Sequence, residues 1–372
     1  MLRAEAIVDL DAIRDNVALM KRGTAAEVMA VVKADGYGHG LVPSARAALA
    51  GGATWLGTAT IDEALALRAA GIDVPTLAWL WTTDDAGAVE RAVAQGIDLS
   101  VSNRWQLAIV ADAARTHGRP ARVHLKIDTG LSRNGSYVDD WPDLVSATAK
   151  DDAVDAIGVW SHFAYADAPG HPTIGKQLGV FAEALEIAAS AGIRPQLRHI
   201  ANSAATLTLP AAHFDLVRPG IAVYGLTPVP QEGDFGLRPA MTLRARLASV
   251  KRVRAGEGVS YGHVYTTQRE TTLALVPLGY ADGIPRHATN VGPVAINGAR
   301  FTVSGRVCMD QFVVDVGDLP VSEQDDAVLF GPGTDGEPLA QDWADAIGTI
   351  HYEIVTRIGP RVPRTYRGEQ SR

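Results

Sequence analysis

The chain has 372 residues, 47% of them apolar and 20% charged, which is enough for two domains or one large barrel with an addition. Its net charge of −8 argues against a nucleic-acid-binding surface, which needs clustered lysine and arginine. The single cysteine, Cys308, excludes an internal disulfide and a multi-thiolate metal site, and no run of eighteen apolar residues is present to span a membrane.

The first two thirds of the sequence alternate between helix-like and strand-like segments. Asp9 can cap a helix that runs to about Lys21, and Thr60 with Glu63 has the pattern of a capping box at the start of another helix. Eight segments have the apolar character of strands: 28–33, 54–58, 76–80, 98–101, 122–127, 157–161, 198–201 and 220–223. Strand–helix alternation predicts parallel strands and, with eight repeats, a (β/α)₈ TIM-type barrel in an α/β protein. A doubly wound open sheet is the alternative that the strand count does not exclude.

Beyond Pro239 the pattern becomes that of a mainly β domain. The segment 241–254 alternates apolar and charged residues, as a half-buried strand does. Shorter strands are predicted at 272–276, 301–303, 312–316 and 327–330, with one helix at 338–347. The segment 233–238 is the predicted joint. We therefore expect a barrel domain over residues 1–235 and a β-rich domain over residues 236–372.

Polar residues stand at or near the ends of the predicted barrel strands, where barrel enzymes build their active sites. They are Lys33, Lys126, Asp128, His162, Asn202, Ser203 and Arg218. Lys33 ends an apolar strand and precedes a glycine-rich turn. Either its stem lies along the apolar surface with the ammonium in water, or its desolvated amine has a lowered pKa and forms a Schiff base with an aldehyde.

Ser203 and the segment 220–221 are candidate contacts for a phosphate, because a hydroxyl and bare backbone N–H groups suit a dianion. Ser203 can equally be a helix N-cap, and the two roles are compatible. The glycines after Lys33 do not match the dinucleotide-binding pattern, since the third comes one residue early. Nothing near Cys308 indicates an activated thiol, and the histidines lack metal-ligand spacing, so we expect no metal.

A set of short motifs extends in order along nearly the whole chain. They are VKADGYGHG (32–40), HLKIDTGLSRNG (124–135), SHFA (161–164), ANS (201–203), RPGI (218–221), VSYG (259–262), GYADG (279–283), RVCMDQ (306–311) and HYE (351–353). Together they resemble the motifs of the alanine racemase family, fold-type III enzymes that use pyridoxal 5′-phosphate. Leu131–Ser132 and His263 depart mildly from that pattern, which bears on the entrance or the dimer contact.

The resemblance implies a two-base reaction. Lys33 resembles the lysine that holds the cofactor as a Schiff base, and Tyr261 resembles the second base, supplied by the partner subunit of a homodimer. Two bases on opposite faces can remove a proton from one side of Cα and deliver one to the other. A tyrosine needs nearby positive charge to act as a base, and His162 with Arg218 resembles the relay that provides it. Arg218 also resembles the residue facing the pyridine nitrogen, whose proton an arginine cannot accept.

The resemblance further implies a set of binding residues. The cofactor contacts are Lys33, Tyr37, His162, Asn202, Ser203, Arg218, Gly220, Ile221 and Tyr352. The substrate contacts are Arg133, the backbone N–H of Met309, and Tyr280. Lys126 matches a position that is carbamylated in parts of the family, where the anionic carbamate would orient Arg133.

We therefore expect a cytoplasmic enzyme that interconverts L-alanine and D-alanine and supplies D-alanine for peptidoglycan. The N-terminal residues lack the apolar core of a signal peptide. A broader amino-acid or serine racemase on the same scaffold is the first alternative, because a small pocket discriminates poorly against one added hydroxyl. A non-catalytic pyridoxal-phosphate-binding protein would lack the β-rich domain. A fold-type III decarboxylase would carry a carboxylate where Arg218 stands.

Overall fold

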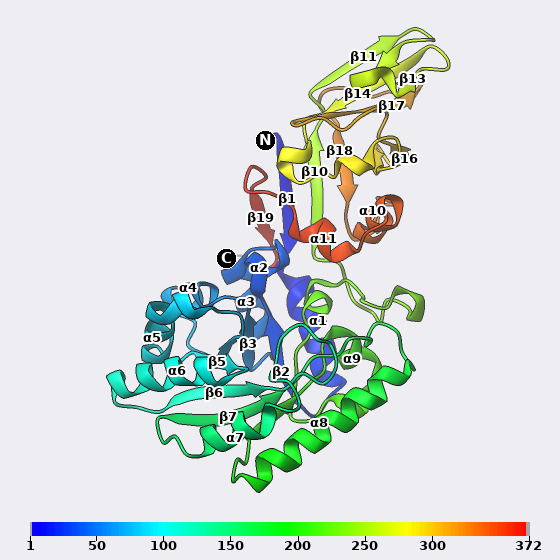
Figure 1. The fold of residues 1–372 in the computed structure, drawn as a ribbon. Coiled ribbons are helices and arrows are strands. Elements are labelled where there is room, and N and C mark those ends of the chain that lie inside the picture. Colours follow the sequence, from blue (N-terminus) through cyan, green and yellow to red (C-terminus); the bar gives the residue numbers. More distant parts are fainter. Residues whose placement is uncertain (1, 370–372) are drawn as a thin grey trace. The chain divides into compact units, whose positions relative to one another are not determined.

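The predicted barrel of parallel strands is present in the computed structural model, which describes residues 2–369. Its strands are β2 (Glu27–Val31), β3 (Trp55–Thr58), β4 (Thr76–Ala78), β5 (Asp98–Val101), β6 (Ala121–Lys126), β7 (Val154–Trp160), β8 (Leu197–His199) and β9 (Leu216–Val217). They pair in the order β8-β7-β6-β5-β4-β3-β2-β9, so each strand lies beside its neighbour in sequence except that β9 pairs with β2. Figure 1 labels β2, β3, β5, β6 and β7 of this barrel.

Backbone hydrogen bonds close the barrel between β8 and β9. The N–H of Asp215 donates to the carbonyl of Arg198 over 3.1 Å, and the N–H of Arg218 donates to the carbonyl of Ala201 over 2.9 Å. The carboxylate of Asp215 also accepts from Nε and Nη2 of Arg198, at 2.7 and 2.9 Å. The strand edges that an open sheet would leave unpaired are thus joined, which favours the barrel over the doubly wound alternative.

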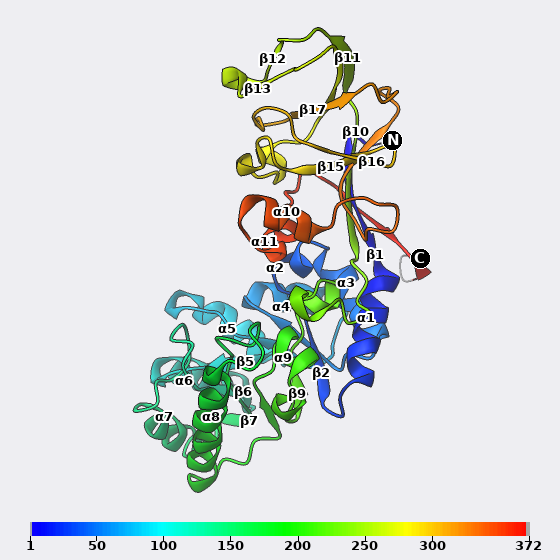
Figure 2. The ribbon, with the colours of Figure 1, turned by 90° about the vertical axis from the view of Figure 1, so that its right-hand side faces the viewer.

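Helices surround the barrel strands, as Figures 1 and 2 show. They are α1 (Leu10–Arg22), α3 (Leu41–Ala50), α4 (Ile61–Ala69), α5 (Ala86–Ala94), α6 (Arg104–His117), α7 (Trp141–Ala149), α8 (Pro172–Ser190) and α9 (Ser203–Thr208). Both predicted helix starts are confirmed. Asp9 Oδ1 accepts from the N–H of Ala12 over 3.0 Å, and Thr60 and Glu63 form the reciprocal capping box of α4.

One predicted barrel strand is wrong. Residues 220–223 were expected to be extended, but Ile221–Tyr224 is a 3₁₀ turn, and the last strand is Leu216–Val217. Pro219 separates the two. Because proline has no backbone N–H, it cannot continue a strand ladder, so the chain leaves the sheet there. The other barrel strands begin or end within three residues of their predicted limits.

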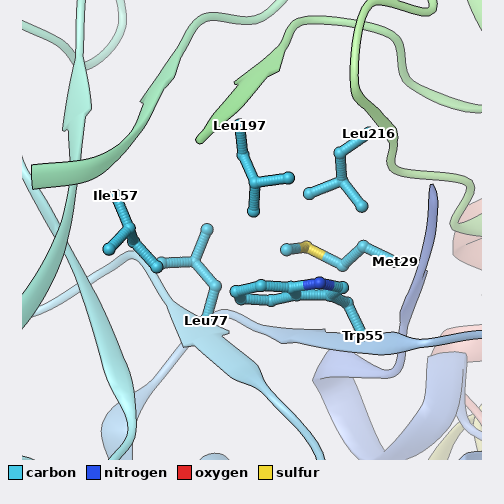
Figure 3. Close-up of a cluster of buried hydrophobic side chains, with 6 residues drawn as sticks. All are labelled: Met29, Trp55, Leu77, Ile157, Leu197 and Leu216. Atoms are coloured by element: carbon cyan, nitrogen blue, oxygen red, sulfur yellow. The ribbon is translucent and has the colours of Figure 1, made fainter. Parts of the chain in front are cut away.

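A layer of apolar side chains fills the barrel interior near the starts of the strands. Figure 3 shows these side chains pointing toward one another, with the Met29 side chain beside the Trp55 ring. The layer consists of Met29, Trp55, Leu77, Ile157, Leu197 and Leu216. Each is buried, and burying such a side chain stabilises the fold by about 1.5–3 kcal/mol. This layer lies toward the N-terminal ends of the strands, whereas the polar residues predicted for the site follow the C-terminal ends.

Among the described residues, the β-rich unit contains three sheets. The largest has the order β16 (Ala299–Thr302), β15 (Pro293–Ile296), β18 (Asp326–Phe330), β10 (Met241–Arg246), β1 (Ala4–Asp9) and β19 (Arg364–Arg367). The smaller sheets are β11 (Ser249–Val253), β14 (Thr271–Val276) and β17 (Phe312–Gly317), and β12 (Gly258–Val259) with β13 (Tyr265–Thr266). The unit also has helices α10 (Ala340–Ile347) and α11 (His351–Thr356).

The strand expected over 241–254 is divided in the structure. Its two halves are β10 and β11, separated by Leu247 and Ala248. The N–H of Leu247 donates to the carbonyl of Asp325, whereas that of Ala248 donates to the carbonyl of Leu275. The chain therefore passes from one sheet to the other at this point, and the strict alternation of β10 is not kept in β11.

The division into units differs from the predicted domains at the N-terminus. The barrel unit comprises residues 13–36 and 41–237, and the β-rich unit takes the segment through Ala12, the turn 37–40 and the chain from Arg238 onward. The prediction placed residues 1–235 together. Strand β1 belongs to the β-rich unit because it is antiparallel to β10 and parallel to β19, with Ala6 opposite Leu243 and Arg364. Within residues 2–369, no helix is long and apolar enough to cross a membrane.

Candidate active site

Lys33 follows β2 and opens a left-handed turn. Ala34 and Asp35 both have φ of 53°, a region that residues other than glycine rarely adopt. Hydrogen bonds hold the turn. Glu63 Oε1 accepts from the N–H of Ala34 over 2.7 Å, and Asp35 Oδ1 accepts from the N–H of Leu41 over 2.8 Å. These hydrogen bonds hold Ala34 and Asp35 in their strained conformations and so fix the backbone that follows Lys33.

The surroundings of Lys33 favour its neutral amine. Burial lowers its pKa below the ordinary value, and the charge of Arg133 lowers it further, while Glu63 acts in the opposite direction. The Nζ atom lies 5.8 Å from the centre of the Trp79 ring. A neutral amine is the form that attacks a carbonyl carbon, so the position suits a nucleophile.

Lys126 is a buried amine at the end of β6. Burial and the charges of Arg218 and Arg133 lower its pKa to about 7. Its Nζ lies 4.4 Å from the centre of the Trp160 ring. Near neutral pH a large fraction of this lysine is therefore uncharged, which relieves repulsion in a region rich in cations.

Arg218 is held at the same end of the barrel by several contacts. Its Nη1 donates to Nδ1 of His199 over 3.0 Å, and its Nη2 donates to the carbonyl of Ser161 over 2.7 Å and approaches Nδ1 of His162 at 3.3 Å. The guanidinium carbon lies 4.7 Å from the centre of the Trp160 ring. Burial lowers its pKa to about 9, so Arg218 remains a cation at neutral pH. Burial and then the charge of Arg218 lower the pKa of His162, which favours a neutral imidazole.

The start of α9 and the 3₁₀ turn after β9 form a backbone cradle around Ser203. Asn202 caps α9 by accepting from the N–H of Ala205 over 3.1 Å. Ser203 Oγ accepts from the N–H groups of Gly220 and Ala222, at 2.8 and 3.3 Å. Because two donors already occupy this oxygen, its own hydroxyl hydrogen remains to be donated to an anion. A group of hydrogen-bond donors that includes no carboxylate suits the binding of a phosphate.

Two predicted cofactor contacts lie in the β-rich unit. The ring centres of Tyr37 and Tyr352 are 6.4 Å apart, with the ring planes inclined at 47°. Both residues therefore belong to one aromatic pair in that unit, and neither is part of the barrel unit that contains Lys33.

The other predicted residues of the β-rich unit are exposed and close together in the backbone. Tyr261 is 72% exposed, and Met309 and Tyr280 are also exposed. The N–H of Tyr280 donates to the carbonyl of Cys308 over 3.0 Å, and Ser260 Oγ donates to the carbonyl of Arg306 over 2.8 Å. These bonds join the segments that carry the three side chains.

Ser260 has a backbone conformation that is usual only for glycine. Its φ is 61° and its ψ is −172°. A residue in this region costs about 1–3 kcal/mol, and the bond from its side chain to Arg306 helps to hold it. The conformation sets the direction in which the following residue, Tyr261, leaves the backbone.

Sequence reasoning missed His199 and Trp160, which hold Arg218 in place. The two rings stack with their centres 5.7 Å apart and their planes within 5°. His199 lies in a short strand, and a histidine among barrel strand residues was the signal that could have identified it. The sequence indicates Glu63 as a helix-capping residue, but its bond to the turn after Lys33 depends on tertiary structure.

Comparisons with known proteins agree with this geometry. Residues 8–228 match the family model described as "Alanine racemase, N-terminal domain", and residues 240–366 match "Alanine racemase, C-terminal domain". The alanine racemase of Salinispora arenicola is 63% identical, with both chains fully covered. The crystal structure of alanine racemase from Streptomyces lavendulae has a TM-score of 0.97 at 55% identity, covering 99% of this chain and 98% of that one. The alanine racemase of Streptomyces coelicolor has a TM-score of 0.97 at 58% identity, with the same coverage.

Proposed function

Because the chain belongs to the alanine racemase family, whose activity is the interconversion of L- and D-alanine, we propose that it works with pyridoxal 5′-phosphate and two bases, Lys33 and Tyr261 of the partner subunit. Racemisation of alanine, an isomerase activity, follows from the family. The cofactor, the dimer and the roles of individual residues are the proposal. A cytoplasmic location and a supply of D-alanine to peptidoglycan complete it.

The residues of the barrel unit fit the proposed cofactor. Lys33 would hold its aldehyde carbon, Ser203 with the backbone at 220–221 would hold its phosphate, and Arg218 would face its ring nitrogen. When bound, the cofactor supplies an electron-withdrawing ring that makes the α-hydrogen of the amino acid acidic. One observation carries this proposal. The same end of the barrel holds Lys33 with its lowered pKa, the Ser203 hydroxyl, which can donate its hydrogen, and the buried guanidinium of Arg218. His162, Asn202, Tyr37 and Tyr352 complete the predicted contacts.

Two protein groups would exchange protons with Cα. Lys33 Nζ takes the proton from D-alanine and returns it when L-alanine is the substrate. The Tyr261 oxygen of the partner subunit would take the proton from L-alanine as the phenolate, and as the phenol it would donate a proton to Cα when D-alanine is the substrate. A 72% exposed tyrosine on a strained turn is presented outward rather than packed against its own unit, which suits a group delivered to another subunit.

The substrate carboxylate would be held by one cation and by neutral hydrogen-bond donors. Arg133 can bind it through two parallel bonds, and the backbone N–H of Met309 and the side chain of Tyr280 are the further predicted contacts. Lys126, with a pKa of about 7, has the neutral amine that reacts with carbon dioxide. The nitrogen bonds to the carbon of CO₂ and loses one proton, giving an anionic carbamate. That anion would sit beside Arg133 and restore charge balance.

Borohydride labelling tests the cofactor assignment. Protein loaded with pyridoxal 5′-phosphate is reduced, digested and mapped, and we expect the label on Lys33 alone. Lys126→Met is the matched control, because Lys126 also follows a barrel strand and also has a lowered pKa, and it should leave the label in place. Label on another lysine, or no label after reconstitution, would contradict the proposal.

Mixing inactive subunits tests the shared site. Lys33→Ala and Tyr261→Phe homodimers should each be nearly inactive, but a hybrid contains one site with both bases. Partial recovery of D-alanine formation after subunit exchange, followed by an oxidase-coupled assay, is the expected result. No recovery when exchange is verified by mass spectrometry would place both bases in one chain.

A further inference from the structure

A chain of hydrogen bonds crosses the barrel interior behind Arg218. From Arg218 Nη1 it passes to His199 Nδ1, at 3.0 Å. His199 Nε2 lies 2.8 Å from His124 Nδ1, and His124 Nε2 lies 3.2 Å from Asp98 Oδ2. Both histidines and Asp98 are almost completely buried. At the far end, Arg122 binds Asp98 through Nε and Nη2, at 2.8 and 3.2 Å.

The two ends of this chain fix its direction. A guanidinium only donates and a carboxylate only accepts, so Arg218 must donate to His199 Nδ1, and Asp98 must accept from His124 Nε2. His199 must then carry its hydrogen on Nε2 and give it to His124 Nδ1. One arrangement alone satisfies every atom, with both imidazoles neutral and both protonated on Nε2. The lowered pKa of His199, caused by burial and then by Arg218, agrees with a neutral ring.

The barrel makes specific room for the histidines. Gly158 on β7 lies opposite His124, and a Cβ there would come within 2.2 Å of His124 Nδ1. The His124 ring meets the edge of Trp55 with the ring centres 5.5 Å apart, and His199 stacks on Trp160. A side chain larger than glycine at 158 would displace the atom that accepts from His199. The chain is therefore built into the barrel core, where each ring is held in one orientation.

We propose that Asp98 is a positioning residue for Arg218, acting through His124 and His199 by fixing the tautomer of each ring. The Nδ1 lone pair of His199 then always faces the guanidinium, and Arg218 keeps one orientation toward the site. This inference rests on the proposed function for the role of Arg218 opposite the cofactor ring. The chain begins at the buried guanidinium of Arg218, and the buried carboxylate of Asp98 is the anion at its other end, beyond two neutral rings.

Replacing Asp98 by asparagine removes the constraint with little change in shape. A carboxamide both accepts and donates, so it can give a hydrogen to His124 Nε2. The chain then reverses, and His199 carries its hydrogen on Nδ1, directed at the Nη1 hydrogen of Arg218. Two donors cannot share that contact, so Arg218 would lose its support at Nη1. A displaced catalytic contact of this kind costs about ten-fold or more in rate.

Nitrogen NMR of ¹⁵N-histidine-labelled protein reads the tautomers directly, with and without added pyridoxal 5′-phosphate. Signals are assigned with His124→Gln and His199→Gln variants. Wild-type protein should show both rings neutral and protonated on Nε2 at pH 7.5, and Asp98→Asn should lose this single state. A wild-type ring that is cationic, or protonated on Nδ1, overturns the proposal even if the variant does not fold.

Kinetics with two controls separates positioning from stability. Arg122→Gln removes the ion pair but leaves the Asp98 carboxylate, and Asp215→Asn removes the comparable Arg198–Asp215 pair elsewhere in the barrel. We expect Asp98→Asn to lower kcat about ten-fold with KM little changed, and both controls to retain kcat and the tautomers. Equal loss of kcat in Arg122→Gln, or loss in Asp98→Asn with unchanged tautomers, overturns the proposal. Absence of cofactor binding would instead contradict the proposed function, and the tautomer result would stand independently.

Discussion

Replacing Lys126 by methionine should change how the stability of the protein depends on pH. In the folded protein the pKa of Lys126 is lowered from 10.5 to about 7 by burial and by the neighbouring guanidinium groups. Between these values the unfolded chain binds a proton that the folded protein has released, so stability rises with pH, by up to about 1.4 kcal/mol per pH unit. The full gain is present above the unfolded pKa and is lost as the pH falls toward 7. Summed from pH 7 to pH 9, it is roughly 2 kcal/mol.

The assay compares urea unfolding of wild type and Lys126→Met in CO₂-free buffer across this pH range. Tryptophan fluorescence reports mainly the barrel unit, because every tryptophan except Trp343 lies there. The wild type should gain about 2 kcal/mol more than the variant between pH 7 and pH 9. Lys150→Met, at an exposed lysine, is the control and should follow the wild type. Parallel pH profiles for wild type and Lys126→Met would refute the reasoning, because the amine would then not titrate differently in the folded state.

Bicarbonate extends the same experiment to the carbamate. Only the neutral amine reacts with carbon dioxide, so the modification should form above pH 7 and be lost below it. With ¹³C-bicarbonate, the wild type should show a carbamate carbon signal that is absent from Lys126→Met. A signal that persists in the variant would assign the modification to another amine.

Three further outcomes are expected. Met29→Ala should lower the free energy of unfolding by about 2–5 kcal/mol, because it opens a cavity in the apolar layer of the barrel, and a loss below 1 kcal/mol in urea titrations would mean that the layer collapses around it. Asp215→Asn should lower the free energy of unfolding by about 1 kcal/mol at pH 7. Because the bond from Arg198 lowers the Asp215 pKa below its usual 3.8, the difference in stability from wild type should shrink as the pH falls through that range. A difference that stays constant down to pH 2 would argue against the ion pair. Tyr261→Ala should still exchange the α-hydrogen of D-alanine in D₂O through Lys33 but nearly lose exchange on L-alanine, by roughly 10²–10⁴-fold, and equal loss on both enantiomers would contradict two separate bases.

The barrel could be predicted because its signals are local. Each strand is a short apolar run, and two of the helices have a start signal in the sequence, Asp9 for one and Thr60 with Glu63 for the other. The failure at 220–223 has the same origin: the run after Pro219 is apolar and β-branched, but proline ends the ladder before it. Strand β1 was missed because its partners, β10 and β19, lie far along the sequence, and long-range pairing leaves no local pattern.

Individual candidate residues of the site could be proposed from the sequence, but the contacts between them could not. Lys33 and Arg218 stood out as polar residues at strand ends, whereas nothing in the sequence showed that His199 and Trp160 would hold Arg218. A hydrogen-bond partner is set by how strands are arranged around the barrel, and side-chain positions within a closed sheet are not encoded in the spacing along one strand. The left-handed turn at Lys33 is similar, because its stabilising bond comes from Glu63 on another element.

The place of β1 in the sheet has a consequence for how the chain is made. During translation β1 leaves the ribosome before both of its partners, because its antiparallel neighbour begins at Met241 and its parallel neighbour at Arg364. The whole barrel can therefore be synthesised, and can fold, while β1 still has two unpaired edges. As long as its partners have not been synthesised, the unpaired edges of β1 can pair with other nascent chains. Charged residues at both ends of β1, Glu5 and Asp9, disfavour such pairing until the last strand arrives.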